Sequence, residues 1–134
     1  MPGSFIDTNI LLYIASGDVE KADRAEQIVA GGGAISVQVL SEAASVARRR
    51  MRLSWAETRA FLAMLRDLLT VHPVSVEVHE IGLALGERHH FSIYDAMIVA
   101  SALHADCETL LSEDMQHGML IGGRLEILNP FRQG

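Results

Sequence analysis

Short apolar runs alternate with longer segments of helical periodicity along the whole chain. The runs are bounded by Gly, Asp, Ser or Asn, which is typical of short buried strands. They lie at 5–6, 34–36, 110–111 and 125–128, with a further short strand or edge segment at 72–74. Between them, apolar residues recur at spacings of three and four, which predicts helices. The helices are expected just after Asp7 and over 19–30, 37–51, 54–70, 76–90 and 91–100.

This alternation of strands and helices favours a parallel sheet covered by helices on both faces. We therefore predict an α/β fold, a three-layer α/β/α sandwich around a central, mostly parallel sheet of short strands. The chain is long enough for one domain with its own core, so residues 1–134 are expected to form a single domain. Two consecutive helices predict an αα-hairpin at about 37–70, and Ser54 and Glu57 fit a capping box at the start of its second helix.

The composition limits the classes of function. A formal net charge of −6 argues against a protein that binds nucleic acid by covering itself in positive charge, but not against an enzyme that meets nucleic acid through a bound cation. The single cysteine, Cys107, excludes an internal disulfide and a cysteine-cluster metal site. No apolar run reaches the length of a membrane span, and the N-terminus has no signal-peptide pattern. We therefore expect a cytoplasmic protein without membrane association.

Four acidic residues stand at positions that call for an explanation. Asp7 directly follows the first buried strand, and in open α/β sheets ligands bind outside the carboxyl ends of the strands. Asp95 lies in the first turn of an almost entirely apolar helix, where an unpaired charge is costly. Glu42 borders an apolar helical stripe, and Asp114 follows a strand, beside Glu113. Taken singly, each position also fits a helix cap or a surface acid.

In the predicted parallel sheet, these acids are expected to lie close together. Right-handed crossovers put all strand carboxyl ends on one side, so three or four carboxylates would share one pocket. Carboxylates that close cannot all stay ionised without a compensating positive charge. That charge is usually a hard divalent cation with oxygen ligands, Mg²⁺ or Mn²⁺, which can activate water and stabilise charge on a phosphoryl group. The pattern therefore points to metal-dependent phosphoryl chemistry.

A basic cluster closes the predicted helix 37–51. It consists of Arg48, Arg49, Arg50 and Arg52. Cations at a helix C-terminus complement the helix dipole, which is a sufficient structural reason for them. They are also the densest basic cluster in an acidic chain and the best candidates for contacts with phosphates if the substrate is a polyanion. Both interpretations stay open at this stage.

Four segments, in order, carry a family resemblance that covers essentially the whole chain. They are Phe5-Ile6-Asp7-Thr8-Asn9, Ser41-Glu42, Tyr94-Asp95-Ala96 and Leu111-Ser112-Glu113-Asp114. With them the sequence resembles PIN-domain ribonucleases and, within that family, the VapC-type toxins of toxin–antitoxin pairs. The resemblance implies a PIN-like version of the predicted sandwich.

The resemblance also implies which residues form the catalytic and metal-binding site. The acidic residues of the catalytic site would be Asp7, Glu42, Asp95 and Asp114. Of these, Asp7 and Asp95 are expected to bind Mg²⁺ or Mn²⁺ directly, and the other two directly or through water. Asn9 and Ser112 match polar positions that orient the acids or the water, although family members more often carry Thr where this chain has Ser112. Whether Glu113 contributes beside Asp114 stays open.

The implied activity is hydrolysis of RNA phosphodiesters by a metal-dependent endoribonuclease, the toxin of a type II toxin–antitoxin system. The implied partners are RNA, a small antitoxin protein that covers the acidic groove, and a second copy of the chain, as a homodimer or a dimer of toxin–antitoxin pairs. One alternative is a non-catalytic PIN-fold module that docks RNA or protein. The presence of all four acids favours the enzyme. The sequence does not identify the RNA, the cleavage sequence or the antitoxin.

Overall fold

A computed structural model describes residues 3–132 of the chain. Its strands form one sheet in the order β3-β2-β1-β4-β6-β5. The strands are β1 (Ser4–Ile6), β2 (Ala34–Ser36), β3 (Thr70–His72), β4 (Thr109–Leu111), β5 (Leu120–Ile121) and β6 (Leu125–Leu128). Neighbouring strands are parallel except β5 and β6, which are antiparallel. The predicted sheet, mostly parallel and short-stranded, is confirmed.

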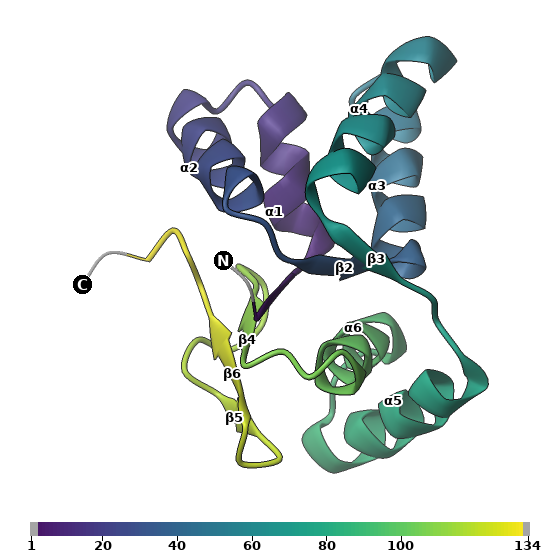
Figure 1. Cartoon of the computed structure of the whole chain (residues 1–134), viewed down its shortest axis with the longest axis vertical. Helices are drawn as coiled ribbons and strands as arrows, with labels where there is room; N and C mark the ends of the chain where they lie inside the picture. Colours follow the sequence, from purple (N-terminus) through teal and green to yellow (C-terminus); the bar gives the residue numbers. More distant parts are fainter. Residues whose placement is uncertain (1–2, 133–134) are drawn as a thin grey trace.

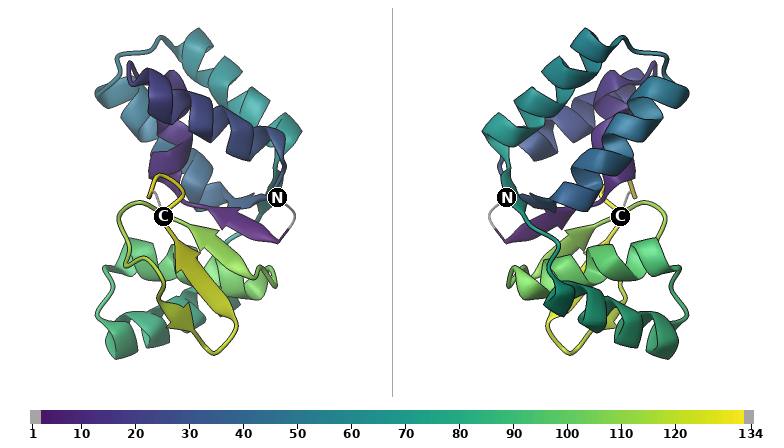
Figure 2. Two further views of the ribbon diagram at one scale, coloured as in Figure 1. Left: turned by 90° about the vertical axis from the view of Figure 1, so that its left-hand side faces the viewer. Right: turned by 90° about the vertical axis from the view of Figure 1, so that its right-hand side faces the viewer.

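Helices cover both faces of this sheet. They are α1 (Thr8–Leu12), α2 (Val19–Ala30), α3 (Val37–Arg49), α4 (Trp55–Leu68), α5 (Val76–His89) and α6 (Ile93–His104), and a short 3₁₀ helix, η1 (Tyr13–Ala15), follows α1. The four helices α1 to α4 lie on one side of the sheet and the pair α5 and α6 on the other (Figure 1). The two side views show the same three layers (Figure 2). This is the predicted α/β/α arrangement, and none of the described helices has the length and apolar character to cross a membrane.

The central strands and α6 form the core. Phe5 and Ile6 of β1 and Leu110 of β4 have no exposed surface, as expected of strands covered on both faces. Helix α6 is buried from Ala96 to Ala102, which accounts for its nearly uniform apolar sequence. Its contact with α5 is close at Gly82, where an added Cβ would lie 2.5 Å from the Met97 sulfur. Glycine therefore permits the crossing of α5 and α6.

Side-chain caps explain where several helices begin. The Ser92 hydroxyl accepts a hydrogen bond from the Asp95 amide, so α6 starts at Ile93, two residues later than predicted. The predicted capping box of Ser54 and Glu57 is present at the start of α4. Helix α4 packs against α3, as expected of the predicted αα-hairpin.

Two details at the sheet edges differ from the sequence prediction. The strand expected at 72–74 lies at Thr70–His72, because α4 ends earlier and this register pairs Ile35 with Val71. Pro73, which lacks an N–H donor, follows the strand. Strand β5 was not predicted. Gly122 and Gly123, with φ of 60° and 69°, form the tight turn to β6 that their sequence between two apolar runs could have indicated.

Candidate active site

Asp7 is fixed at the carboxyl end of β1, where it begins α1. Its side chain is only 4 % exposed. Oδ1 accepts a hydrogen bond from the Thr8 amide at 2.7 Å, and Oδ2 accepts one from the Ser112 hydroxyl at 2.8 Å. Ser112 follows β4, whose Leu111 is paired with Ile6 of β1, so the parallel register places the two residues side by side. Asp7 therefore caps its helix and is also held by the neighbouring strand.

Three carboxylates from different elements share one electrostatic environment. The pKa of Asp7 is raised to about 6, mainly by burial and in smaller part by the charges of Asp95 and Asp114, while the hydrogen bonds from Ser112 and Thr8 oppose the rise. The pKa of Asp95 is raised by burial, lowered by its hydrogen bond with Ser92 and raised by the charge of Asp114. Within residues 3–132, none of the three forms an ion pair with a basic side chain. Their mutual repulsion is therefore left uncompensated by the protein.

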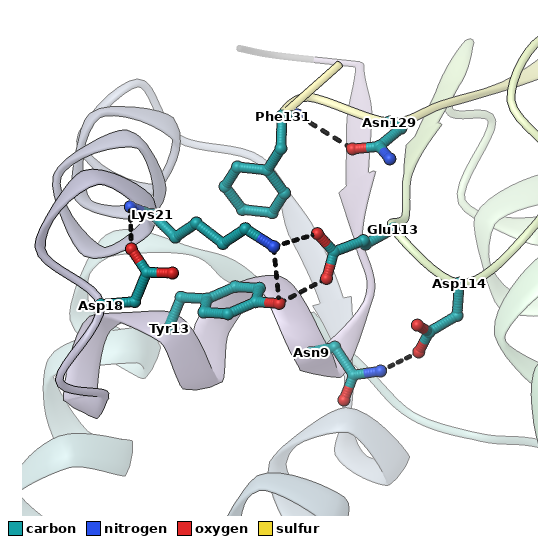
Figure 3. Close-up of polar contacts among 8 residues, drawn as sticks. All are labelled: Asn9, Tyr13, Asp18, Lys21, Glu113, Asp114, Asn129 and Phe131. Atoms are coloured by element: carbon teal, nitrogen blue, oxygen red, sulfur yellow. Dashed lines mark hydrogen bonds and ion pairs between the residues drawn. The ribbon is translucent and has the colours of Figure 1, made fainter.

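Asp114 lies near Asn9 on the exposed side of this edge. The Asn9 side-chain amide donates a hydrogen bond to Asp114 Oδ2 (Figure 3). Both residues line a hollow of about 240 Å³, together with Leu12, Tyr13, Ser16, Met51 and Glu113. A larger hollow of about 690 Å³ lies between α3, α4 and β3, and none of the four acids lines it. The acidic edge is thus an open surface site rather than a deep pocket.

Glu42 reaches the same edge from α3. Its Oε1 accepts a hydrogen bond from the Gln38 side-chain amide at 3.0 Å and lies 3.5 Å from the Thr8 hydroxyl. Gln38 also donates to the carbonyl of Tyr94 at 3.1 Å, and thereby ties α3 to the first turn of α6, beside Asp95. Gln38 was not among the predicted residues. Its spacing of four residues from Glu42, which places both on one helix face, was the available signal.

The chemistry of these side chains fits a hard divalent cation. Carboxylate oxygens are the ligands that Mg²⁺ and Mn²⁺ prefer, and a cation would offset both the burial of the Asp7 charge, which is the main cause of its raised pKa, and the repulsion from Asp95 and Asp114. As the side chains stand, no three His, Cys, Asp or Glu residues in the described chain are gathered closely enough to hold a metal ion. The types of donor suit such a cation, but the side chains would have to move to bind one together.

Glu113 has different bonding partners from Asp114, although the two residues are adjacent and line the same hollow. Its carboxylate accepts hydrogen bonds from the Tyr13 hydroxyl and from Lys21 Nζ, the latter at 2.5 Å (Figure 3). Burial alone would raise the pKa of Glu113, but the bonds from Lys21 and Tyr13 outweigh it and the pKa lies below its ordinary value. Correspondingly, the bond to Glu113 raises the pKa of Lys21. Glu113 is thus a compensated charge.

The arginine cluster divides into two kinds. Arg48 is half-buried, donates to the Leu53 carbonyl at 2.7 Å and lies over the Trp55 ring at 4.4 Å from its centroid. These contacts give it a structural role at the α3–α4 connection. Arg49, Arg50 and Arg52 are exposed and stay candidates for contacts with phosphates.

Comparison with known proteins identifies the family. The model of the PIN domain family matches residues 4–117. The chain belongs to the PIN domain family. A search among curated protein sequences gave no match.

Several solved structures share the fold. One, titled a toxin–antitoxin complex from Klebsiella pneumoniae, has 23 % identity and a TM-score of 0.72 over 97 % of this chain and 99 % of that one. VapBC2 from Rickettsia felis, bound to a DNA fragment from its promoter, has 19 % identity and a TM-score of 0.66 over 96 % and 100 %. VapC20 from Mycobacterium tuberculosis, described as a toxin that cleaves the sarcin–ricin loop, has 19 % identity and a TM-score of 0.64 over 83 % and 89 %.

Proposed function

We propose that this chain is an endoribonuclease that requires a divalent cation, Mg²⁺ or Mn²⁺, and that it is the toxin of a toxin–antitoxin pair. The observation that carries the proposal is the buried carboxylate of Asp7 at the end of β1, in the field of Asp95 and Asp114 and without a cationic partner among the described residues. An arrangement of this kind is unfavourable for folding and is typical of functional sites. Membership of the PIN domain family supports the assignment.

Each acid has a distinct role in this proposal. Asp7 and Asp95 would hold the cation, with Glu42 and Asp114 beside it or linked to it through water. When bound, the cation would activate water for attack and stabilise the charge that develops on the RNA phosphoryl group. Each oxygen of Asp7 accepts one hydrogen bond from the protein and keeps a second acceptor position.

The surrounding polar residues hold these acids in place. Thr8 and Ser112 fix the carboxylate of Asp7, and Asn9 orients Asp114. Gln38 orients Glu42 and braces the start of α6. Fixed ligands of this kind reduce the ordering that cation binding requires. No lysine is needed as a base, and Lys21, the only lysine of the chain, bonds to Glu113 instead.

The partners proposed are RNA, an antitoxin and a second copy of the chain. Two of the structures that share the fold carry titles naming a toxin–antitoxin complex or VapBC2, which supports an antitoxin partner here. An antitoxin that covers the acidic edge would need a cationic group there, because the edge is uncompensated on its own.

The test is cleavage of purified total cellular RNA by the native protein, with and without Mg²⁺ or Mn²⁺. We expect discrete fragments that require the cation and are absent with Asp7→Ala. The matched control is Asp23→Ala, which removes an exposed acid from α2. The intact mass of the sample establishes whether antitoxin is bound. Absence of cleavage by antitoxin-free native protein would contradict the proposal and favour a non-catalytic module.

A further inference from the structure

Lys21 joins four separate segments of the described chain. From α2, its Nζ bonds to Glu113 at 2.5 Å and to the Tyr13 hydroxyl at 3.1 Å. It also lies 4.6 Å from the centroid of the Tyr13 ring and 5.2 Å from that of Phe131. The two rings meet edge to face at 5.1 Å. The side chain of Lys21 therefore lies between two aromatic rings and ends on a carboxylate (Figure 3).

The carboxylate that Lys21 holds belongs to the turn that carries Asp114. This turn is anchored at its start, where the Ser112 hydroxyl donates to Asp7 and accepts from the Met115 amide at 3.2 Å. Its next residue, Glu113, is bonded to Lys21 of α2 and Tyr13 of η1, and Asp114 is bonded to Asn9 of α1, one helical turn before Tyr13 (Figure 3). Asp114 itself is exposed. The direction of its side chain thus depends on the anchors on either side of it.

Both oxygens of Glu113 are occupied within this network. Oε1 accepts from the Tyr13 hydroxyl and Oε2 from Lys21 Nζ. The lysine is half-buried, with a side chain 33 % exposed, and the side chain of Glu113 is 24 % exposed. An isolated surface ion pair stabilises little, but this one is shared with a hydroxyl and two rings, so it can fix geometry.

We propose that Lys21 is a positioning residue of the acidic site. Through Glu113 it fixes the 112–115 turn so that Asp114, and not Glu113, faces the cation. The inference rests on the proposed function for its catalytic consequence, while its structural part concerns the turn alone. Partners one step outside a metal site typically change metal affinity or activity by about 10- to 100-fold when removed. We expect a loss near the lower end of that range for Lys21→Met.

The experiment is a double-mutant cycle on the full chain, with Mn²⁺ and Mg²⁺ binding measured by calorimetry in the absence of RNA. We compare Lys21→Met, Glu113→Ala and the double variant. If Lys21 acts through Glu113, each single change weakens cation binding by about tenfold and the double change is no worse than either. If Glu113 is itself a ligand, Lys21→Met leaves binding intact or strengthens it, and only Glu113→Ala weakens it. That result would overturn the proposal.

Two matched variants separate positioning from loss of charge. Arg24→Met removes a positive charge from the same helix and should leave cation binding unchanged, because within residues 3–132 the side chain of Arg24 is hydrogen-bonded only to the Pro130 carbonyl, at 3.4 Å. Lys21→Arg keeps a cation that can bond to Glu113 and stack on the rings, and should restore most of the affinity. In RNA cleavage, Lys21→Met should lower kcat more than it raises KM. Equal effects of Arg24→Met and Lys21→Met would contradict positioning.

Amide hydrogen exchange distinguishes failure of this inference from failure of the proposed function. The Met115 amide is bonded to the Ser112 hydroxyl, so it reports on the turn. Lys21→Met should speed its exchange and leave the amide of Leu110 in β4 unchanged. If the native protein binds no divalent cation, the proposed function fails, but faster exchange at Met115 still supports the anchor. Unchanged exchange at Met115 would overturn the inference that Lys21 anchors the turn, whether or not the native protein binds a cation.

Discussion

Glu113 and Asp114 are neighbours in the sequence with opposite surroundings in the structure. Glu113 is bonded to Lys21 and Tyr13, and these bonds keep its pKa below the ordinary value. Among the described residues, the side chain of Asp114 is hydrogen-bonded only to the neutral amide of Asn9, and its charge raises the pKa of Asp7 and of Asp95. The protein therefore neutralises one acid internally and leaves the adjacent one without a cationic partner among the described residues.

The same contrast separates the arginines after α3. Arg48 is engaged with the Leu53 carbonyl and the Trp55 ring, while Arg49 and Arg50 project into solvent. In both places, charges that the fold satisfies serve the structure, and charges that it leaves unsatisfied are the candidates for binding. Residue type alone does not separate these roles.

The largest effect is expected from Asp7→Asn. Asparagine has nearly the same shape and can still accept the bond from the Thr8 amide, but it lacks the charge that would bind a cation. Cleavage of RNA should fall by more than about a hundredfold, beyond the loss typical of residues outside the ligand set. Initial rates at saturating Mg²⁺ measure this, and circular dichroism checks that the fold is kept. A variant with native activity would remove Asp7 from the mechanism.

The pH dependence of stability should show the unfavourable burial of Asp7. Its pKa is about 6 in the folded protein and near 3.8 when unfolded, so the folded state binds more protons between these values. The free energy of unfolding should therefore fall as pH rises from about 4 to 7, by up to about 3 kcal/mol from this group. Asp95, whose pKa is also raised, acts in the same direction.

Urea unfolding at several pH values in the absence of metal measures this slope. Asp7→Asn should flatten it and should be more stable than the native protein at pH 7.5. Adding Mg²⁺ at that pH should stabilise the native protein and leave Asp7→Asn unchanged, because a ligand stabilises only the form that binds it. An equal pH slope in both proteins would show that Asp7 does not titrate in this window.

A pair of changes tests the comparison of the two neighbouring acids. Asp114→Asn should lower cleavage by about 10- to 100-fold, since it removes a charge that faces the site. Glu113→Gln should lower it by less than about tenfold, because glutamine still offers an oxygen to Lys21. Initial rates for both variants at subsaturating Mg²⁺ decide the order. The reverse order would exchange the roles assigned to the two residues.

The smallest effects are expected at the arginines. Changing Arg49 and Arg50 to Gln should weaken RNA binding and reduce the dependence of log K on log salt by about 0.7 for each lost phosphate contact. Arg48→Met should leave that slope unchanged and lower stability by about 1 kcal/mol, through loss of its bond and its ring contact. Filter binding with the Asp7→Asn background and thermal unfolding measure the two effects. If the slope of log K against log salt is unchanged in the double variant, Arg49 and Arg50 do not contact RNA phosphates.

The elements of the fold and the position of Asp7 follow from local patterns in the sequence. Strand β1 and helix α6 are recognised by their apolar runs, and Asp7 by its place at a helix start. The strand β3 was misplaced by two residues because its register depends on pairing with β2, which no local pattern records. A turn of two glycines was the only local sign of β5.

Which acids near the site are paired and which are unpaired could not be predicted, since the pairing depends on contacts between distant segments. Lys21 and Glu113 are 92 residues apart, and Tyr13 and Glu113 are 100 apart. The C-terminal tail carried no recognisable signal, yet Phe131 packs on Tyr13 and Lys21. The direction in which Glu113 and Asp114 point is settled by these partners rather than by the local sequence.

The most direct test of the account is a calorimetric titration of the antitoxin-free native protein with Mn²⁺ and Mg²⁺ at pH 7.5, in parallel with Asp7→Asn. If the uncompensated acids at the ends of β1 and β4 form a cation site, the native protein will bind the cation saturably and the variant will not. Absence of binding to the native protein, or equal binding to both, would contradict it.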